Sequence, residues 1–581
     1  MSTLAASEFV PADIDCSKWE NIEPYFNELR DRDVTNASEF ERWLLERSEL
    51  DATVGEAAAV RYIAMTCDTA SDDKKQAYLS FVENIIPKMT PADFELNTKQ
   101  ADLAKRFDLG ERYFVINRDT ISAVELFREA NVPLQTELTK LDSDYDTVCG
   151  AMTVQFDGEE KTLPQMGTYQ ESGDRAVREE AWKVVSERRA QNADEISTIF
   201  DKMVGLRDTV AKNAGFENFV GYAFKAKGRF DYTPEHCFAF HEGIEKHVMP
   251  FVARLDAKRK AELGVDSLRP WDLSVDPKGG AALTPFDGGA DLVAKTGRVF
   301  DRLSPELGEM FGSMGDGTNT DGADNGASLD LDSRKGKAPG GYQYMRDRSR
   351  RAFIFMNAAG LHRDVETMVH EAGHAFHSMY AVDEPLVHYR GAPIEFCEVA
   401  SMSMELLTMP MWDEYYPDAG DATRARRKQL EGSIGLLPWI ATIDSFQHWI
   451  YTNPGHSRDD RTAKWLEIEQ RFGHMGHHVD WSGIEAHRPL VWQRQGHLFG
   501  APFYYVEYGI AQLGALGLWL MSLEQGVDTA LGAYKRAMTL GGSKALPALF
   551  EAADLPFDFG PDTVGRLVDR VETEMDKLPE S

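Results

Sequence analysis

The sequence is poor in cysteine and in basic residues. Its 581 residues include five cysteines, which are widely spaced and form no CxxC pair. This spacing excludes a disulfide framework and argues against a thiolate zinc site. Lys and Arg number 63 against 95 Asp and Glu, so the formal net charge is −32. Because nucleic acids and anionic lipid surfaces both require a basic face, we expect neither as a partner.

Long hydrophobic runs are also missing. No stretch reaches the roughly 18 apolar residues that a membrane-spanning helix needs. The most apolar stretch, 510–522, is too short and contains Gln512, so we expect a buried helix there. The N-terminal 20 residues contain neither the basic nor the apolar region of a secretory signal. We therefore expect a cytoplasmic protein that is not attached to a membrane.

Helix signals outnumber strand signals along the chain. Thr90-Pro91 and Thr233-Pro234 each predict a helix start, because proline is favoured at the first helical position after a capping residue. The clearest strand signals are at 151–156 and 352–357, where β-branched and aromatic residues are frequent. Together these patterns predict a mainly α protein.

The division of the chain is less clearly marked. Residues 312–341 are rich in Gly, Asp and Asn but lack the EF-hand spacing, so we expect a surface loop. We predict a helical N-terminal region over 1–200 and a catalytic region over 201–581, although no Pro/Gly linker marks the boundary.

The most informative segment is 364–380, which contains an HExxH motif at His370-Glu371-Ala372-Gly373-His374. On a helix, histidines at i and i+4 lie about 40° apart on one face and can share a metal ion. The Glu between them can then act on a water at that ion. The opposite face of this helix carries an apolar stripe: Val365, Met368, Val369, Ala372, Phe376 and Met379. The segment therefore predicts a metal-binding helix packed against a core.

A catalytic zinc ion needs a third protein ligand and an open position. Metzincins have a His six residues after the second His, and Tyr380 stands there in this chain, which disfavours that class. His377 lies about 10 Å along the helix from His370, so we interpret it as a supporting residue that does not bind the ion. Downstream glutamates are the remaining source: Glu384, Glu395, Glu398 and Glu405. Spacing alone does not separate Glu395 from Glu398.

Several blocks of the chain follow the order found in one known family. These blocks are RKGKAPGGYQY (334–344), AFIFMN (352–357), DVETMVHEAGHAFH (364–377), PIEFCEVASMSMELL (393–407), HRPLVWQRQGHLFGAPFYYVEYGIAQLGAL (487–516) and TLGGSKALPALFEAADL (539–555). On these blocks the chain resembles the thimet oligopeptidase and oligoendopeptidase F family of zinc metallopeptidases, and most closely the oligoendopeptidase F branch. Gln343 departs from the family pattern, which has Cys at this position, and residues 1–200 match only loosely.

The resemblance implies one zinc ion per chain, bound by His370, His374 and Glu398. It also implies that Glu371 is the general base of the reaction. Glu395 would then orient a ligand histidine without binding the ion.

Further site residues follow from the C-terminal block. His497, Tyr505 and Tyr508 match family positions that contact the substrate carbonyl and the tetrahedral intermediate. Thimet-like members have one more residue between this His and the tyrosines. Tyr504 therefore stays an alternative for the tyrosine that stabilises the oxyanion.

The resemblance also implies a fold and a reaction. The family fold is a two-lobed helical clamshell with a deep channel and a small β-sheet beside the zinc site. The implied activity is zinc-dependent hydrolysis of internal bonds in short unfolded peptides, with folded proteins excluded by the channel. We expect an extended substrate to pair with the strand at 352–357 through main-chain hydrogen bonds.

Alternatives to this interpretation remain. A dipeptidyl carboxypeptidase would use the same chemistry but release different product ends. A peptide-binding protein would use the metal only to hold its fold together. A serine hydrolase is unsupported because the GxSxG elbow is absent. Cobalt or manganese fits the same ligands as zinc, and the sequence does not indicate side-chain preference or oligomeric state.

Overall fold

The computed structural model describes residues 9–317, 328–473 and 478–579. Residues 318–327, within the Gly-rich stretch 312–341, lie outside this description. The described chain is mainly helical, with a two-stranded hairpin and one three-stranded sheet, which confirms the predicted fold class.

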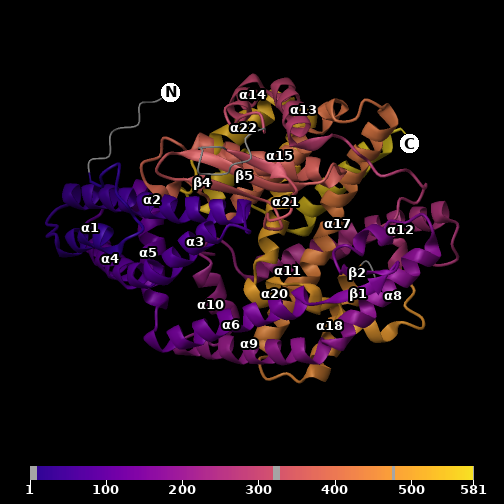
Figure 1. Cartoon of the computed structure of the whole chain (residues 1–581), viewed down its shortest axis with the longest axis horizontal. Helices are drawn as coiled ribbons and strands as arrows, with labels where there is room; N and C mark the ends of the chain where they lie inside the picture. The colour runs from indigo at the N-terminus through magenta and orange to yellow at the C-terminus, as the bar shows by residue number, and fades with distance from the viewer. Residues whose placement is uncertain (1–8, 318–327, 474–477, 580–581) are drawn as a thin grey trace.

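The N-terminal part is helical and lies on one side of the molecule, at left in Figure 1. It consists of α1 (Trp19–Asp31), α2 (Ala37–Cys67), α3 (Asp72–Asn84), α4 (Ile86–Arg106) and α5 (Phe114–Leu126). The next elements are α6 (Val132–Gly150), β1 (Thr153–Phe156), β2 (Glu159–Thr162), α7 (Gly167–Gln170), α8 (Arg175–Gln191), α9 (Ala193–Asn213) and α10 (Phe219–Ala226). Helices α6 and α9 run along the lower edge of the view (Figure 1).

A small sheet lies in the upper part of the view (Figure 1). Before the sheet come α11 (Pro234–Gly243), α12 (Met249–Leu263), α13 (Gly288–Leu303) and α14 (Pro305–Gly312). The sheet and the helices after it are β3 (Leu329–Asp332), β4 (Tyr342–Arg346), β5 (Arg351–Ala358), α15 (His362–Tyr380), α16 (Ile394–Leu407), α17 (Ala419–Thr452), α18 (Arg458–Phe472), α20 (His497–Gly500), α21 (Tyr505–Gln525), α22 (Val527–Met538), α23 (Leu546–Ala552) and α24 (Pro561–Lys577). In this view α13, α14, α15 and α22 lie near the sheet, whereas α18 and α20 lie in the lower part (Figure 1).

The three-stranded sheet has the order β3-β5-β4, with β3 parallel and β4 antiparallel to β5. Alternate side chains of the central strand β5 enter different clusters, because successive strand residues point to opposite faces. Phe353 and Phe355 pack with Ile63 and Cys67 of α2. Ile354 and Met356 join the main core together with the apolar side of α15. Burial on both faces explains why the predicted strand is continuously apolar.

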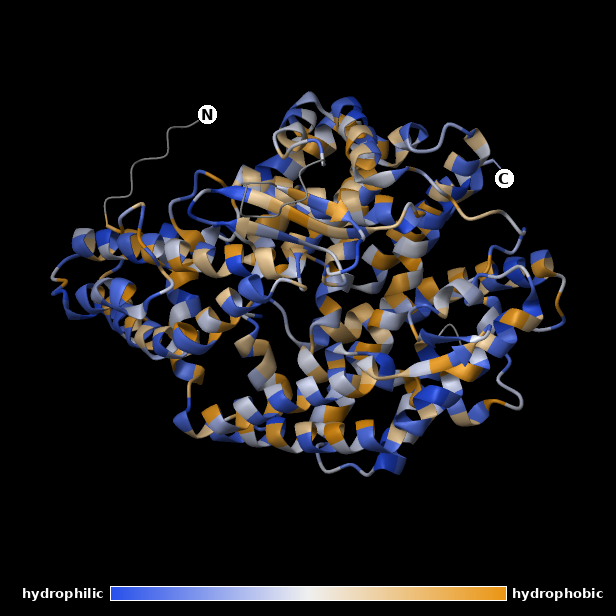
Figure 2. Ribbon diagram, in the orientation of Figure 1, coloured by the Kyte–Doolittle hydropathy of each residue, from blue (hydrophilic) through white to orange (hydrophobic). Residues whose placement is uncertain are grey.

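Buried apolar side chains form two large clusters. One extends from Val10 to Ile116 and also includes Leu386 and Tyr389. The main cluster draws on residues from Leu141 to Met575. Along many helices, hydrophilic and hydrophobic residues are interleaved, as in amphipathic helices with one apolar face (Figure 2). The predicted boundary near residue 200 stays a prediction.

Helix α21 contains the apolar stretch noted in the sequence. Among the described residues it is the one helix long and apolar enough to cross a membrane, and 78% of its most apolar window is buried inside the protein. It packs against α16, α17, α22 and α24. This burial is that of a core helix, as predicted.

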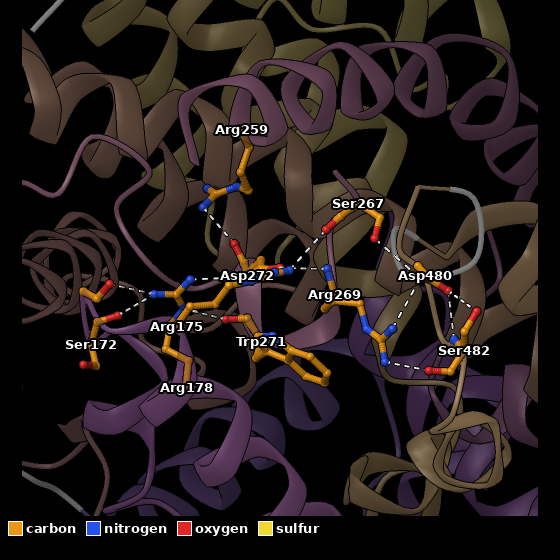
Figure 3. A network of polar contacts seen from close by, with 11 residues as sticks. Ser172, Arg175, Arg178, Arg259, Ser267, Arg269, Trp271, Asp272, Asp480 and Ser482 are labelled. Atoms are coloured by element: carbon orange, nitrogen blue, oxygen red, sulfur yellow. Dashed lines mark hydrogen bonds and ion pairs between the residues drawn. The ribbon is translucent and has the colours of Figure 1, made fainter. Parts of the chain in front are cut away.

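An ion network centred on one buried carboxylate joins α8 to two loops (Figure 3). Asp272 is fully buried and accepts hydrogen bonds from Arg175 at 2.7 Å and from Arg178 at 3.0 Å. Arg269 donates its backbone N–H to the same carboxylate, and its guanidinium reaches Asp480 at 3.3 Å. The network therefore fixes the segment around 480 against α8.

Candidate active site

The HExxH helix is α15, and its predicted apolar stripe is buried except for Met379, which is partly buried. Val365, Met368, Val369, Ala372 and Phe376 are all fully buried in the main core. His370 and His374 lie on the other face, with ring centroids 4.9 Å apart. The core thus fixes the rotation of the helix about its axis, and with it the direction of both imidazoles.

A close helix contact brings α16 to these histidines. A Cβ atom on Gly373 would lie 2.6 Å from both the carbonyl oxygen of Ala400 and the Cα of Ser401. Tyr534 hydroxyl reaches the carbonyl oxygens of both Gly373 and Ala400, at 3.3 and 3.2 Å, and so bridges the two helices. Only glycine permits this approach, which sets Glu398 opposite the histidine pair.

Three ligand atoms converge at this crossing. Glu398 Oε2 lies 3.4 Å from His370 Nε2 and 3.6 Å from His374 Nε2, and all three ligand atoms lie within 4.8 Å of one another. Ser401 hydroxyl donates to the same Glu398 oxygen at 2.9 Å. Two imidazole nitrogens and one carboxylate oxygen at these separations fit a tetrahedral zinc ion with one position left for water.

Burial lowers the pKa of His370, but Glu398 and Glu405 outweigh this effect and hold it well above its usual value, so a cation bound there would take the place of a proton. Burial, together with the charge of His370, lowers the pKa of His374 to about 3, so this imidazole is neutral at pH 7. Burial raises the pKa of Glu398, but its hydrogen bond with His370 and the nearby imidazoles outweigh this effect and lower the pKa overall. Burial raises the pKa of Glu371 to about 7, which suits a residue that takes up and releases a proton.

The carboxylate that contacts a candidate ligand histidine is Glu405, whereas the structure gives Glu395 a different partner, so the role predicted for Glu395 stays a prediction. Glu405 Oε1 lies 2.7 Å from His370 Nδ1, and Gln429 donates to its other oxygen at 2.8 Å. Glu395 instead accepts a hydrogen bond from Tyr232 hydroxyl at 2.7 Å. Glu405 stands seven residues after Glu398 and Glu395 three residues before it, both on the same helix face, so spacing alone did not choose between them.

His377 lies one turn beyond His374 and is buried. Burial lowers its pKa to about 4, and its Nε2 has no hydrogen-bond partner among the described residues. The structure therefore places it beside the ligand candidates on α15 without a direct contact to them.

Four aromatic side chains form a cluster at the start of α21. The His497 ring centroid lies 5.5 Å from that of Tyr504, 4.9 Å from Tyr505 and 6.2 Å from Tyr508. The negative charge of Glu398 contributes to raising the pKa of Tyr508, to about 12, after burial as the main cause. Burial and then Tyr508 and Glu398 raise the pKa of Tyr504 as well, so both tyrosines lie close enough to the candidate ligand Glu398 for its charge to act on them.

Tyr505 makes different contacts from those of Tyr504 and Tyr508. Its pKa is raised by burial and lowered by hydrogen bonds to Gln495 and Trp439, with no contribution from Glu398. Trp439 donates to Gln495 at 2.9 Å, and Gln495 contacts His497 Nδ1 at 2.8 Å. Tyr505 therefore belongs to the hydrogen-bonded group that supports His497.

A strained residue turns the chain into α21. Phe503 has φ +64°, in the left-handed region that non-glycine residues seldom adopt. Gln447 accepts its backbone N–H at 2.5 Å, and the buried Arg229 guanidinium donates to its carbonyl oxygen and, at 2.8 Å, to Glu507. This fully buried clamp fixes the direction in which Tyr504 and Tyr508 point, and neither Arg229 nor Gln447 was identified from the sequence.

The strand beside the site is β4 and not β5. Both sides of β5 are paired, so the expected pairing of a substrate with 352–357 is wrong. Among the described residues β4 is paired on one side only, with β5. The backbone N–H of Gln343 on β4 hydrogen-bonds the Glu371 carboxylate. The open side of β4 therefore faces the proposed base.

Known proteins resemble this chain in sequence and in fold. The model of peptidase family M3 matches residues 168–557. Oligopeptidase PepF of Bacillus subtilis (strain 168) is 24% identical over 430 residues, and the match spans 73% of this chain but 61% of the length of PepF. The solved structure of PZ peptidase A with an inhibitor is similar over 98% of this chain and 99% of that chain, with 26% identity and a TM-score of 0.84. A chain assigned as an oligoendopeptidase F gives the same coverage, identity and TM-score.

Proposed function

Because the chain belongs to peptidase family M3, we propose that it is a zinc-dependent oligoendopeptidase that hydrolyses internal bonds of short unfolded peptides. The observation that carries this proposal is the convergence of His370, His374 and Glu398 within 4.8 Å, with Glu371 on the same helix. We propose the cytoplasm as its compartment.

His370, His374 and Glu398 would hold one zinc ion per chain, because their donor atoms and separations suit that metal. Glu405 and Gln429 would fix the ring of His370, and Ser401 the carboxylate of Glu398. When bound, zinc supplies a Lewis acid that makes water nucleophilic near neutral pH.

Glu371 would carry the proton through the reaction. Its burial and its pKa of about 7 let it accept a proton from the attacking water and deliver that proton to the leaving amine. The hydrogen bond from the Gln343 backbone would orient the carboxylate during this transfer.

Charge that develops on the substrate carbonyl oxygen would be stabilised by tyrosine hydroxyls. Tyr508 is our first choice and Tyr504 the second, because the Glu398 charge acts on both. His497 would assist from the same cluster, and Tyr505 would hold His497 in place through Gln495.

The open side of β4 would bind the peptide as an added strand, through main-chain hydrogen bonds. Hydrogen bonds to the peptide main chain depend little on the identity of its side chains, so we propose short peptides of varied sequence as substrates.

The test is cleavage of an internally quenched short peptide by the protein as purified, with a chelator, and after zinc is restored. A tightly folded protein serves as a parallel substrate, and mass spectrometry maps the product ends. We expect internal cleavage that the chelator stops and zinc restores, with the folded protein intact. Release of C-terminal dipeptides alone would favour the dipeptidyl carboxypeptidase alternative. No cleavage by a folded, zinc-loaded sample would contradict the proposal.

A further inference from the structure

Two core helices carry a second cluster of metal-ligating side chains, away from the HExxH helix. Cys237 and His241 lie at i and i+4 on α11, and Asp444 and His448 lie at i and i+4 on α17. The two helices contact each other. Residues at this spacing share one helix face, so each helix presents two potential ligands toward the other. All four side chains are at least 95% buried, at 1%, 3%, 0% and 5% exposure in chain order.

Three of the four have ligand atoms in one place. Cys237 Sγ, an Asp444 carboxylate oxygen and a His448 ring nitrogen all lie within 4.8 Å of one another. Asp444 Oδ2 lies 3.5 Å from His448 Nε2. Ligands bound to one tetrahedral zinc at about 2.0 to 2.3 Å are separated by distances of this order.

Two polar atoms in this cluster lack a good hydrogen-bond partner. Asp444 Oδ1 is buried and makes no hydrogen bond among the described residues, and the 3.5 Å contact of the buried His448 Nε2 with Asp444 Oδ2 is longer than a normal hydrogen bond. Buried polar atoms of this kind cost free energy unless a partner is supplied, and each calls for an explanation. A cation between His448 and Asp444 would supply that partner to both.

His241 supports the cluster through hydrogen bonds and is not one of its three converging ligands. Ser445 hydroxyl lies 3.0 Å from its Nδ1, and its Nε2 lies 2.9 Å from Asp444 Oδ2. With Ser445 as donor to Nδ1, the Nε2–H points at the carboxylate. A histidine so fixed holds Asp444 in one orientation, in the way that outer residues orient metal ligands.

Aromatic rings surround part of the cluster. The rings of Phe238 and Phe503 lie 5.0 and 5.1 Å from that of His448, and Phe224 lies at 5.9 Å. Phe238 is itself 48% exposed, and the charge of the buried Arg229 acts on Cys237, so these rings cover only part of the cluster.

We propose that Cys237, Asp444 and His448 form a second, structural site for a divalent cation of the zinc class, oriented by His241 and separate from the proposed catalytic centre. The sulfur, nitrogen and carboxylate set suits zinc. Cys237 releases its thiol proton to solvent when its sulfur binds the cation. The cation joins α11 to α17, and Gln447 beside His448 holds the strained Phe503 that leads into the tyrosine cluster.

The test separates this site from the catalytic one by removing the latter. The full chain with His370→Ala and His374→Ala is expressed in zinc-supplemented medium, so that zinc is present while the core forms. Zinc content and zinc X-ray absorption are then measured. We expect one tightly held zinc per chain, with a sulfur neighbour at about 2.3 Å. Since the HExxH ligand set contains no sulfur, this result does not depend on peptidase activity.

In the same background, Cys237→Ser is expected to lower the zinc content at least about tenfold and to remove the sulfur neighbour. Cys149→Ser changes a half-buried cysteine elsewhere and is the matched control, expected to keep both. A folded parent chain without zinc, or with zinc bound only through nitrogen and oxygen, would overturn the proposal and leave a hydrogen-bonded polar cluster. The absorption measurement on the His370→Ala, His374→Ala chain shows whether zinc is bound through sulfur, even if Cys237→Ser does not fold.

Discussion

Replacement of Gly373 by alanine tests how the site is assembled. The added Cβ would lie 2.6 Å from the carbonyl oxygen of Ala400 and from the Cα of Ser401, both backbone atoms of α16. Neither atom can rotate away as the end of a side chain could. Helices α15 and α16 must therefore move apart, and Tyr534, which bridges them, must give up part of its bonding.

The magnitude follows from the contact distance. Non-bonded carbon atoms prefer about 3.5 to 4.0 Å, so relief of the clash requires a shift of about 1 Å. Metal ligands tolerate about 0.2 Å. The shift separates Glu398 from the two histidines by more than zinc accepts, and a displacement of about 1 Å can cost about 10²-fold in rate. Overpacking costs about 1 to 3 kcal/mol of stability, from which the better helix propensity of alanine subtracts up to about 1 kcal/mol.

The assay compares zinc affinity, kcat/KM on a quenched peptide and urea unfolding for Gly373→Ala and the parent. Gly205→Ala is the matched control, because Gly205 lies inside α9 with nothing within 4 Å of its Cβ position. We expect the control to bind zinc and cleave as the parent does. A Gly373→Ala protein with unchanged zinc affinity and unchanged kcat/KM would refute the reasoning that this glycine sets the site geometry.

Three further predictions follow from other contacts. Glu405→Gln weakens the hydrogen bond that orients the His370 ring and should lower zinc affinity about 10- to 100-fold, as measured by chelator competition. Glu395→Gln should leave the zinc affinity unchanged, because Glu395 contacts Tyr232. Equal effects of the two substitutions would contradict the assignment of Glu405. Tyr508→Phe should lower kcat by about 10²- to 10³-fold with little change in KM, and by more than Tyr505→Phe does; the reverse order would return the oxyanion role to Tyr505. Burial raises the pKa of Asp272, but hydrogen bonds from Arg175, the Arg269 backbone and Arg178 outweigh it and hold the pKa below 3.8. The stability that the ionised form contributes is therefore present above about pH 4 and is lost as the pH falls through the lowered pKa. Asp272→Asn should cost about 3 kcal/mol in urea unfolding at pH 7, with the difference from the parent shrinking below pH 3.8; a pH-independent difference would exclude the ionised carboxylate as the cause.

Local patterns predicted the HExxH helix well. The apolar stripe of 364–380 and its opposed histidines required only the helical period, and α15 buries most of that stripe. Thr233-Pro234 opens α11 as predicted, with Thr233 as the N-cap. These features depend on neighbours within one or two turns, which the sequence presents directly.

The same reasoning failed where tertiary packing decides. Pro91 lies inside α4, which begins at Ile86, so the predicted helix start at Thr90-Pro91 is wrong. The capping signal was overridden because α4 follows α3 after a single turn residue, Ile85. Residues 352–357 form a strand, but its place between β3 and β4 depends on pairing that local sequence does not encode.

The sequence also did not reveal which side chains contact the candidate ligands. Glu395 and Glu405 are both acidic residues in an apolar helix, and periodicity does not decide which one meets His370. The contact depends on how α16 crosses α15 at Gly373, and on Gln429 arriving from α17. Likewise, the choice between Tyr505 and Tyr508 depends on the turn at Phe503.

The central claim is that Glu371 carries the proton at a zinc site built by its helix and α16. The most direct measurement is the zinc content and kcat of Glu371→Gln on a quenched peptide, beside those of the parent. The account predicts a folded variant with the parental zinc content and a kcat at least about 10²-fold lower. A zinc-loaded Glu371→Gln protein that cleaves at the parental rate would contradict it.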